Sequence, residues 1–133
     1  MKKRWMAVAL TAILLMAVGG AIGTVSVRQE SENVYDLYFV ERNLRAASGG
    51  DALRAEERAL SGGADSTAQQ AEALMAELLK GPVDQTLKSP FPKGTGLNSV
   101  EQKGTEIHVD FSAVYGTLSG MDLTLADYAV TMT

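Results

Sequence analysis

The chain has 133 residues, enough for one small domain after an N-terminal segment, and its formal net charge is −4. Beyond residue 27 the balance is more acidic, with nine basic and 16 acidic residues, which disfavours binding to nucleic acid because that needs a concentrated basic surface. Cys is absent, so disulfides, thiol chemistry and lipid attachment through a cysteine are excluded.

Residues 1–27 are predicted to be a signal anchor or a signal peptide. Lys2, Lys3 and Arg4 precede an uncharged run at residues 5–27, which as a helix would span roughly 34 Å, enough for the hydrocarbon core of a bilayer. The basic residues should stay in the cytoplasm, which places the remainder outside. We expect an uncleaved membrane anchor, with a cleaved signal peptide or a buried core helix as the alternatives.

Residues 28–33 are predicted to form a linker, and residues 34–40 a first strand, because they are aromatic and β-branched. A loop is expected at residues 44–50. Residues 52–60 consist of good helix formers and their propensity favours a short helix, although nine residues are marginal as an isolated helix.

The next helix begins after Asp65 or Ser66, either of which can cap it. An apolar row recurs at helical spacing along it, formed by Ala71, Leu74, Met75, Leu78 and Leu79. The helix is predicted to end at Gly81 and Pro82, because Gly takes the left-handed C-terminal position and Pro cannot continue a helix. Met75 is interpreted as core filler.

A Pro- and Gly-rich loop leads into a predicted hairpin of strands at residues 97–102 and 105–111. Ile107, Val109 and Phe111 share the face expected to pack on the helix. Asp110 and Ser112 close the second strand, and their short polar side chains suit the neighbouring backbone N–H groups as the chain turns.

The C-terminal segment is predicted to be irregular at residues 115–120 and helical after a cap at Asp122. Its apolar residues at helical spacing are Leu125, Tyr128, Ala129 and Met132.

No residue pattern indicates a catalytic, metal or cofactor site. Glu106, His108 and Asp110 share a strand face, but successive positions lie about 6.6 Å apart, too far to share one ion without help from another element. Ser112 is too far along the strand to bond to His108, the only His, so a nucleophile with its base is not indicated. Residues 93–96 lack the glycine spacing of a phosphate loop and precede a strand.

Three short motifs make the segment from Leu78 to Ser112 resemble the GerMN domain of sporulation and spore-germination proteins of Gram-positive bacteria. The matching positions are Leu78, Leu79, Gly81 and Pro82 at the helix end; Leu87, Ser89, Pro92, Gly94 and Thr95 in the loop; Ser99 and Val100 in the next strand; and Val109, Asp110, Phe111 and Ser112. Phe91 and Gly96 depart from the pattern, which usually has an aliphatic and an apolar residue there.

The resemblance implies that residues 34–133 form an α+β domain, a small sheet with two helices packed on one face, similar to the ring-building modules of secretion and sporulation channels. It also implies that residues 52–60 pair with the first strand, so we expect a strand there. In relatives the last helix continues and a final strand follows, so residues 34–133 are expected to lack both of these parts.

The function implied is a non-enzymatic domain, held at the outer face of the membrane through residues 5–27, that docks to other envelope or sporulation-complex proteins or to its own copies. No cofactor is expected. The alternatives are an envelope domain that binds a small ligand or peptidoglycan outside sporulation, and a cell-wall hydrolase, which would need two carboxylates about 5–10 Å apart in a cleft.

Overall fold

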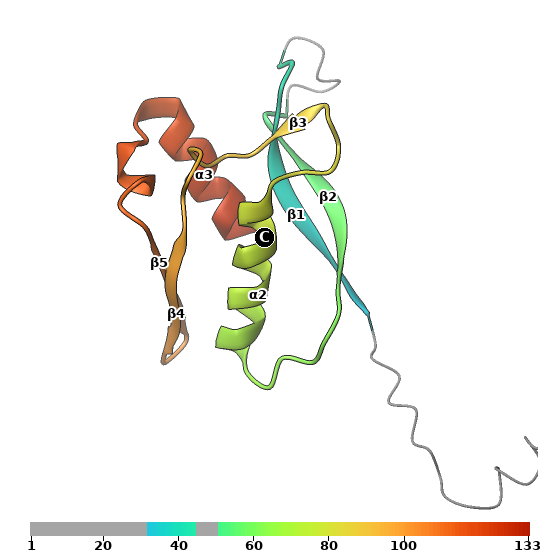
Figure 1. The fold of residues 1–133 in the computed structure, drawn as a ribbon, viewed down its shortest axis with the longest axis vertical. Coiled ribbons are helices and arrows are strands. Elements are labelled where there is room, and N and C mark those ends of the chain that lie inside the picture. The colour runs from blue at the N-terminus through green and yellow to red at the C-terminus, as the bar shows by residue number, and fades with distance from the viewer. Residues whose placement is uncertain (1–31, 45–50) are drawn as a thin grey trace, which may run out of the picture.

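The computed structural model describes residues 32–44 and 51–133 (Figure 1). The elements in chain order are β1 (Asn33–Glu41), β2 (Leu53–Leu60), α2 (Thr67–Lys80), β3 (Leu87–Lys88), β4 (Leu97–Lys103), β5 (Glu106–Phe111), the 3-10 helix η1 (Tyr115–Thr117) and α3 (Gly120–Met132). The predicted membrane segment at residues 5–27 and residues 45–50 of the loop predicted at 44–50 lie outside the described residues. Within the described ranges, no helix is long and apolar enough to cross a membrane.

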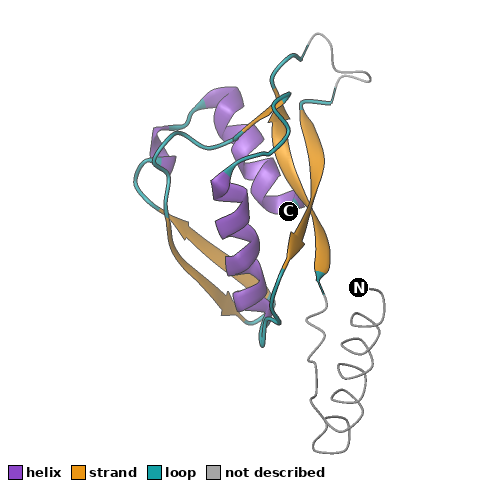
Figure 2. Ribbon diagram, turned by 45° about the vertical axis from the view of Figure 1, so that its right-hand side comes forward, coloured by secondary structure: helices purple, strands orange, loops and turns teal. Residues whose placement is uncertain are grey.

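The strands form two antiparallel sheets, one ordered β2-β1-β3 and the other the hairpin β4-β5. The expectation of a single small sheet was therefore wrong. The physical reason is the position of α2, which lies between the hairpin and the three-stranded sheet and contacts both β4 and β1 (Figures 1 and 2). Both helices lie on the same side of the three-stranded sheet, so the α+β class and the placement of the helices agree with the expectation.

Residues 53–60 form a strand, as the resemblance implied and against their helix propensity. Each residue from Leu53 to Leu60 faces a partner on β1, from Val40 back to Asn33. Pairing along a whole strand offsets the small preference of these residues for a helix. The short strand β3 was not predicted; it pairs Leu87 and Lys88 with the end of β1 inside the segment expected to be a loop.

Helix α2 has the ends that its sequence predicted. Ser66 is the N-cap and its Oγ accepts a hydrogen bond from the backbone N–H of Gln69 at 3.2 Å. At the other end Gly81 has a φ of +86° and its N–H donates to the carbonyl of Leu78. The buried residues of this helix are Leu74, Met75 and Leu78, all from the predicted apolar row.

The core lies between α2, α3 and the inner face of β1. Its buried members are Leu37, Phe39, Leu74, Met75, Leu78, Leu87, Phe91 and Ala126. Leu97, Val109 and Phe111 of the hairpin pack against it, so the apolar face of the hairpin covers α2 as predicted.

Helix α3 begins before its predicted cap. Its N-cap is Ser119, and Asp122 lies in the first turn. The buried residues are Ala126 and Ala129, whereas Tyr128 and Met132 are 58% and 49% exposed. Alanine lets a helix backbone approach its neighbours closely, so the alanine side faces the core and the larger residues of the predicted row face solvent.

Candidate functional site

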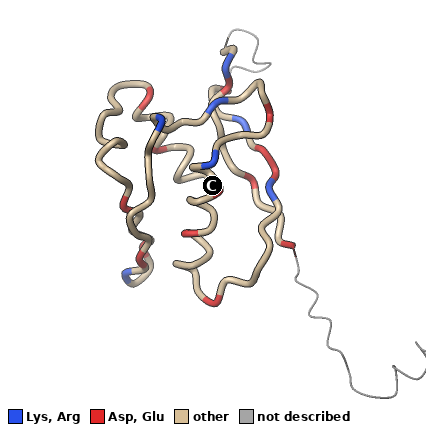
Figure 3. Tube along the Cα trace, in the orientation of Figure 1, with Lys and Arg blue, Asp and Glu red and all other residues tan. Residues whose placement is uncertain are grey.

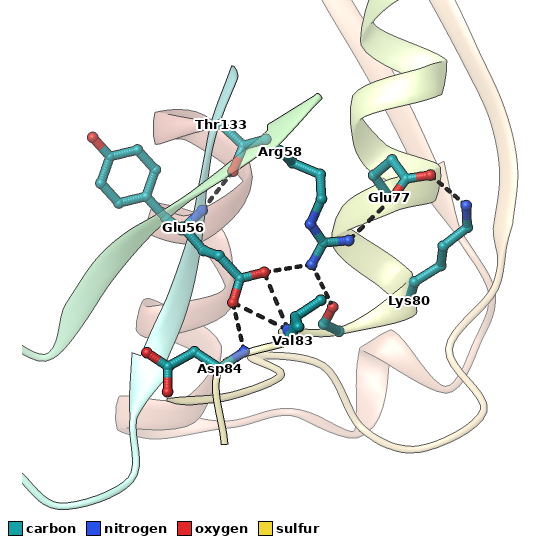
Figure 4. A network of polar contacts seen from close by, with 9 residues as sticks. Glu56, Arg58, Glu77, Lys80, Val83, Asp84 and Thr133 are labelled. Atoms are coloured by element: carbon teal, nitrogen blue, oxygen red, sulfur yellow. Dashed lines mark hydrogen bonds and ion pairs between the residues drawn. The ribbon is translucent and has the colours of Figure 1, made fainter. Parts of the chain in front are cut away.

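The end of α2 is held to β2 by a half-buried polar network (Figure 4). Arg58 of β2 donates from Nη1 to Glu77 at 3.2 Å and from Nη2 to the carbonyl of Gly81 at 3.1 Å, and it also pairs with Glu56. The Glu56 carboxylate accepts hydrogen bonds from the backbone N–H groups of Val83 and Asp84. The Gly81–Pro82 motif is therefore the point at which the helix end, the following loop and β2 are joined.

The two carboxylates of this network have lowered pKa values. Burial alone would raise the pKa of Glu56, but hydrogen bonds from Arg58 and the backbone of Asp84 and Val83 outweigh it and lower the pKa below the ordinary 4.5. The pKa of Glu77 is lowered mainly by the hydrogen bond from Lys80, against the effect of burial. Both groups are therefore ionised at neutral pH and stabilise the fold, and neither is held in the protonated form that a general acid requires.

The loop motif Pro92–Thr95 forms a tight turn. Thr95 donates from both its backbone N–H and its Oγ1 to the carbonyl of Pro92, at 3.2 and 2.8 Å. Gly94 has a φ of +90°, a conformation that favours glycine. These residues shape the entry to β4 and present no reactive group.

Phe91, one of the departures from the family pattern, belongs to an aromatic cluster. Its ring lies 5.4 Å from Phe111 and 5.9 Å from Tyr115, and the rings of Phe111 and Tyr115 stack at 4.9 Å. Burial, and a 2.5 Å hydrogen bond from the Tyr115 hydroxyl to Asp127, raise the pKa of Tyr115. This phenol is therefore protonated at neutral pH and anchors α3 to η1.

Asp110 and Ser112 bind neighbouring segments where β5 ends. Ser112 exchanges two hydrogen bonds with Gly96: its Oγ accepts from the Gly96 N–H at 2.9 Å, and its N–H donates to the Gly96 carbonyl at 2.8 Å. Asp110 accepts from the side-chain amide of Asn98 at 3.1 Å. Of the other motif positions, Leu78 is in the core, and Leu79, Val109 and Phe111 pack against it.

The residues considered for metal binding do not converge. Nε2 of His108 lies 3.3 Å from Glu106, both side chains are exposed, and Asp110 is bonded to Asn98. Among the described residues, no group of three or more His, Cys, Asp or Glu side chains could hold a metal ion.

An exposed apolar row runs along α3. Met121, Leu125, Tyr128 and Met132 are spaced by four, three and four residues, which places them within an arc of about 60° on the helix surface. Met121, Tyr128 and Met132 are 71%, 58% and 49% exposed. We call these four residues the α3 row.

A small hollow of about 260 Å³ adjoins the α3 row where the helix begins. Leu125 of the row forms part of its wall, and the apolar lining also includes Val40, Pro90, Phe91, Pro92 and Leu118. Lys88 and Asp122 also line this hollow, and their charged groups can form hydrogen bonds there. The row and the hollow therefore offer an apolar surface with a recess for one side chain.

The edge of β1 next to α3 is only partly paired. β3 pairs with Val40 and Glu41 alone, and the N–H of Tyr38 donates to Oγ1 of Thr133 at 3.2 Å. Backbone N–H groups alternate between the two edges of a strand, so every second residue of β1 points its N–H to the same edge. Arg42 donates toward the β3 edge, so Val34 and Asp36 also present their backbone groups to that edge. No strand of the described residues pairs with Val34 and Asp36 there.

Sequence reasoning missed the Arg58 network and the place of Met121 in the α3 row. The contacts of this network between β2 and the end of α2 or the following loop join residues 19 to 28 positions apart, so no local spacing indicates them. The row had a signal, because Met121 extends the spacing of Leu125, Tyr128 and Met132 by one step. That spacing identifies a helix face but does not say whether the core or the solvent covers it.

The fold thus defines a small α+β domain with two antiparallel sheets and two helices. Residues 36–133 match the model of the Germane family, described as sporulation and spore germination, and the chain belongs to this family. The resemblance to the GerMN domain is thereby confirmed. The family is not a known enzyme family. No curated protein and no solved structure matches the chain significantly.

Proposed function

We propose that this protein is a non-enzymatic assembly module of a sporulation or spore-germination complex, attached to the outer face of the membrane through residues 5–27. The observation that carries the proposal is the α3 row, an exposed apolar surface on an otherwise acidic domain. Exposed contiguous apolar surface of this kind is typical of protein–protein contacts. Membership of the Germane family supports a role in sporulation or spore germination.

The α3 row has the composition of an interface centre. Met and Tyr are enriched in such centres because they bury large area at little cost in hydrogen bonding, and a recess for an anchor residue is where binding energy concentrates. The hollow beside Leu125 is such a recess. The open edge at Val34 and Asp36 adds backbone groups that can pair with an extended segment of a partner.

The hydrolase alternative has less support. Glu56 and Glu77 are both held by Arg58, and both have lowered pKa values. A glycosidase needs one carboxyl group with a raised pKa to protonate the leaving group. No observation favours that chemistry over an assembly role.

The test compares a double substitution with a single control substitution in the full chain. Tyr128→Lys with Met132→Lys places charge on the α3 row, whereas Val83→Lys alters an apolar residue that is 78% exposed and lies at the end of α2, away from the row. In a strain that lacks the native gene, we expect the row variant to reduce heat-resistant spores or germination at least about tenfold, and to lose crosslinks to its partner. Val83→Lys should behave as the wild type. If the row variant is folded and fully active, the row is not the docking surface.

A further inference from the structure

A groove separate from the α3 row lies between α2 and the β1–β2 pair, beside the loop that joins β2 to α2. Its volume is about 650 Å³, within the usual range of about 300–1,000 Å³ for ligand sites. The walls are formed by Tyr35 of β1, Ala59 of β2, and Gln69, Gln70 and Ala73 of α2. The small side chains leave the space open, so the groove is a surface depression lined by one aromatic ring and several hydrogen-bonding groups.

The polar groups of the groove are arranged as neutral donors and acceptors. Nε2 of Gln70 donates to the Tyr35 hydroxyl at 3.1 Å, which leaves the phenolic proton and the Gln70 carbonyl oxygen available to a ligand. The carbonyl oxygen of Gln69 accepts from the backbone N–H of Asp65 at 2.8 Å, so its NH₂ group remains a donor. Uncharged donors and acceptors of this kind can form hydrogen bonds with the hydroxyl and amide groups of a sugar.

The charges of the groove disfavour an anionic ligand. The described lining contains Asp65 and Glu77 but neither Lys nor Arg. Glu77 is neutralised by Arg58 and Lys80, so it does not attract a strongly cationic ligand either. Figure 3 shows that most Lys and Arg lie toward the end of the domain that holds β3, whereas Asp and Glu are spread over the domain.

We propose that this groove binds a neutral saccharide, such as a unit of an N-acetylated glycan chain. The ring of Tyr35 and the methyl groups of Ala59 and Ala73 receive the apolar face of a sugar ring, while Gln69, Gln70 and the Tyr35 hydroxyl bind its hydroxyl and acetamido groups. The proposal does not depend on the assembly role, because the groove and the α3 row involve different residues.

The test titrates the ¹⁵N-labelled full chain in detergent micelles with four probes and follows the backbone amide signals by NMR. The probes are N-acetylglucosamine, its linear tetramer, the deacetylated cationic tetramer and an anionic oligosaccharide that contains uronic acid. We expect saturable shifts at Tyr35, Ala59 and Gln70 with the neutral tetramer, with a Kd of about 1 mM or below. The anionic probe should bind at least about tenfold more weakly.

A matched pair of substitutions assigns the site. Tyr35→Phe removes only the hydroxyl and should weaken binding of the tetramer about three- to tenfold, the effect of one lost hydrogen bond. Tyr38→Phe makes the same change on the opposite face of β1 and should alter the Kd less than about twofold. The monomer should bind more weakly than the tetramer if the ligand is a glycan chain, and equally if it is a free sugar.

Several outcomes overturn the proposal. The groove is not a saccharide site if the neutral tetramer gives no saturable shift, or if its shifts map outside the groove. Equal or tighter binding of the anionic or cationic probe contradicts the neutral class. An unchanged Kd for folded Tyr35→Phe, or equal losses in both Tyr→Phe variants, shows that this groove does not hold the sugar.

Discussion

The backbone N–H of Tyr38 donates to Oγ1 of Thr133 at 3.2 Å and joins the middle of β1 to the C-terminal residue, 95 positions away. This bond occupies the edge of β1 directly beyond the reach of β3. It fixes the end of α3 against the sheet and, with the alanines of α3, determines which side of that helix faces solvent.

Thr133→Val should therefore lower the free energy of unfolding by about 1 kcal/mol, because the valine has the same shape but cannot accept the hydrogen bond from Tyr38. Urea unfolding followed by circular dichroism measures the loss. Thr131→Val is the control, since the Thr131 hydroxyl donates only to the carbonyl of Asp127 within its own helix. Equal effects of the two substitutions would show that the contact with β1 contributes nothing.

Arg58→Met should destabilise the domain by about 2 kcal/mol or more, because it leaves Glu56 and Glu77 half-buried without their shared partner. Arg54→Met on the same strand is the matched control. Arg54 is half exposed and pairs with Glu41 and Asp84, so its loss should cost less than about 1 kcal/mol. Urea unfolding measures both variants. A larger loss of unfolding free energy for Arg54→Met than for Arg58→Met would show that the Arg58 network is not the stronger of the two.

Stability should fall as the pH drops below the ordinary carboxyl value of 4.5. The pKa values of Glu56 and Glu77 are lower in the folded chain than in the unfolded chain, so the stabilisation is fully present above the unfolded value and is lost as the pH falls through the folded value. Urea midpoints measured from pH 6 down to about pH 3 follow this loss. Glu56→Gln should flatten the profile, and Glu101→Gln, at an exposed position, should leave it unchanged.

Leu74→Asp should unfold the domain, since it places an unpaired carboxylate in the core that Leu74 shares with Leu37 and Phe39. The cost is several kcal/mol, a large part of the stability of a small domain. Ala76→Asp, at an exposed position of the same helix, controls for a change in helix propensity. A melting temperature of Leu74→Asp close to that of the wild type would show that the core is assigned wrongly.

Membrane attachment is checked by fractionation of the native host. We expect the full chain in the membrane fraction, and its domain digested when protease is added to intact protoplasts, because Lys2, Lys3 and Arg4 precede the uncharged run at residues 5–27. A variant with two Asp residues replacing Leu14 and Leu15 should shift the protein to the soluble fraction. Soluble wild-type protein, or a domain shielded from protease, would contradict this location.

The sequence by itself determined several local elements of this domain. The row from Ala71 to Leu79, the cap at Ser66 and the stop at Gly81 define α2, because the helical period and the end signals depend only on neighbouring residues. The alternation in residues 106–111 defines β5 for the same reason. Two of the motifs that carried the resemblance are a helix end and a turn, features that a short stretch of chain specifies without help from the rest.

Only the tertiary structure decided how these elements face one another. Helix α3 is apolar on two sides, with Ala126 and Ala129 on one and the α3 row on the other, so its sequence pattern does not select the buried side. The close approach that alanines permit to β1, together with the bond from Tyr38 to Thr133, selects it. The Arg58 network and the two-sheet arrangement likewise depend on the position of α2 between the sheets, which residues far apart in the chain establish together.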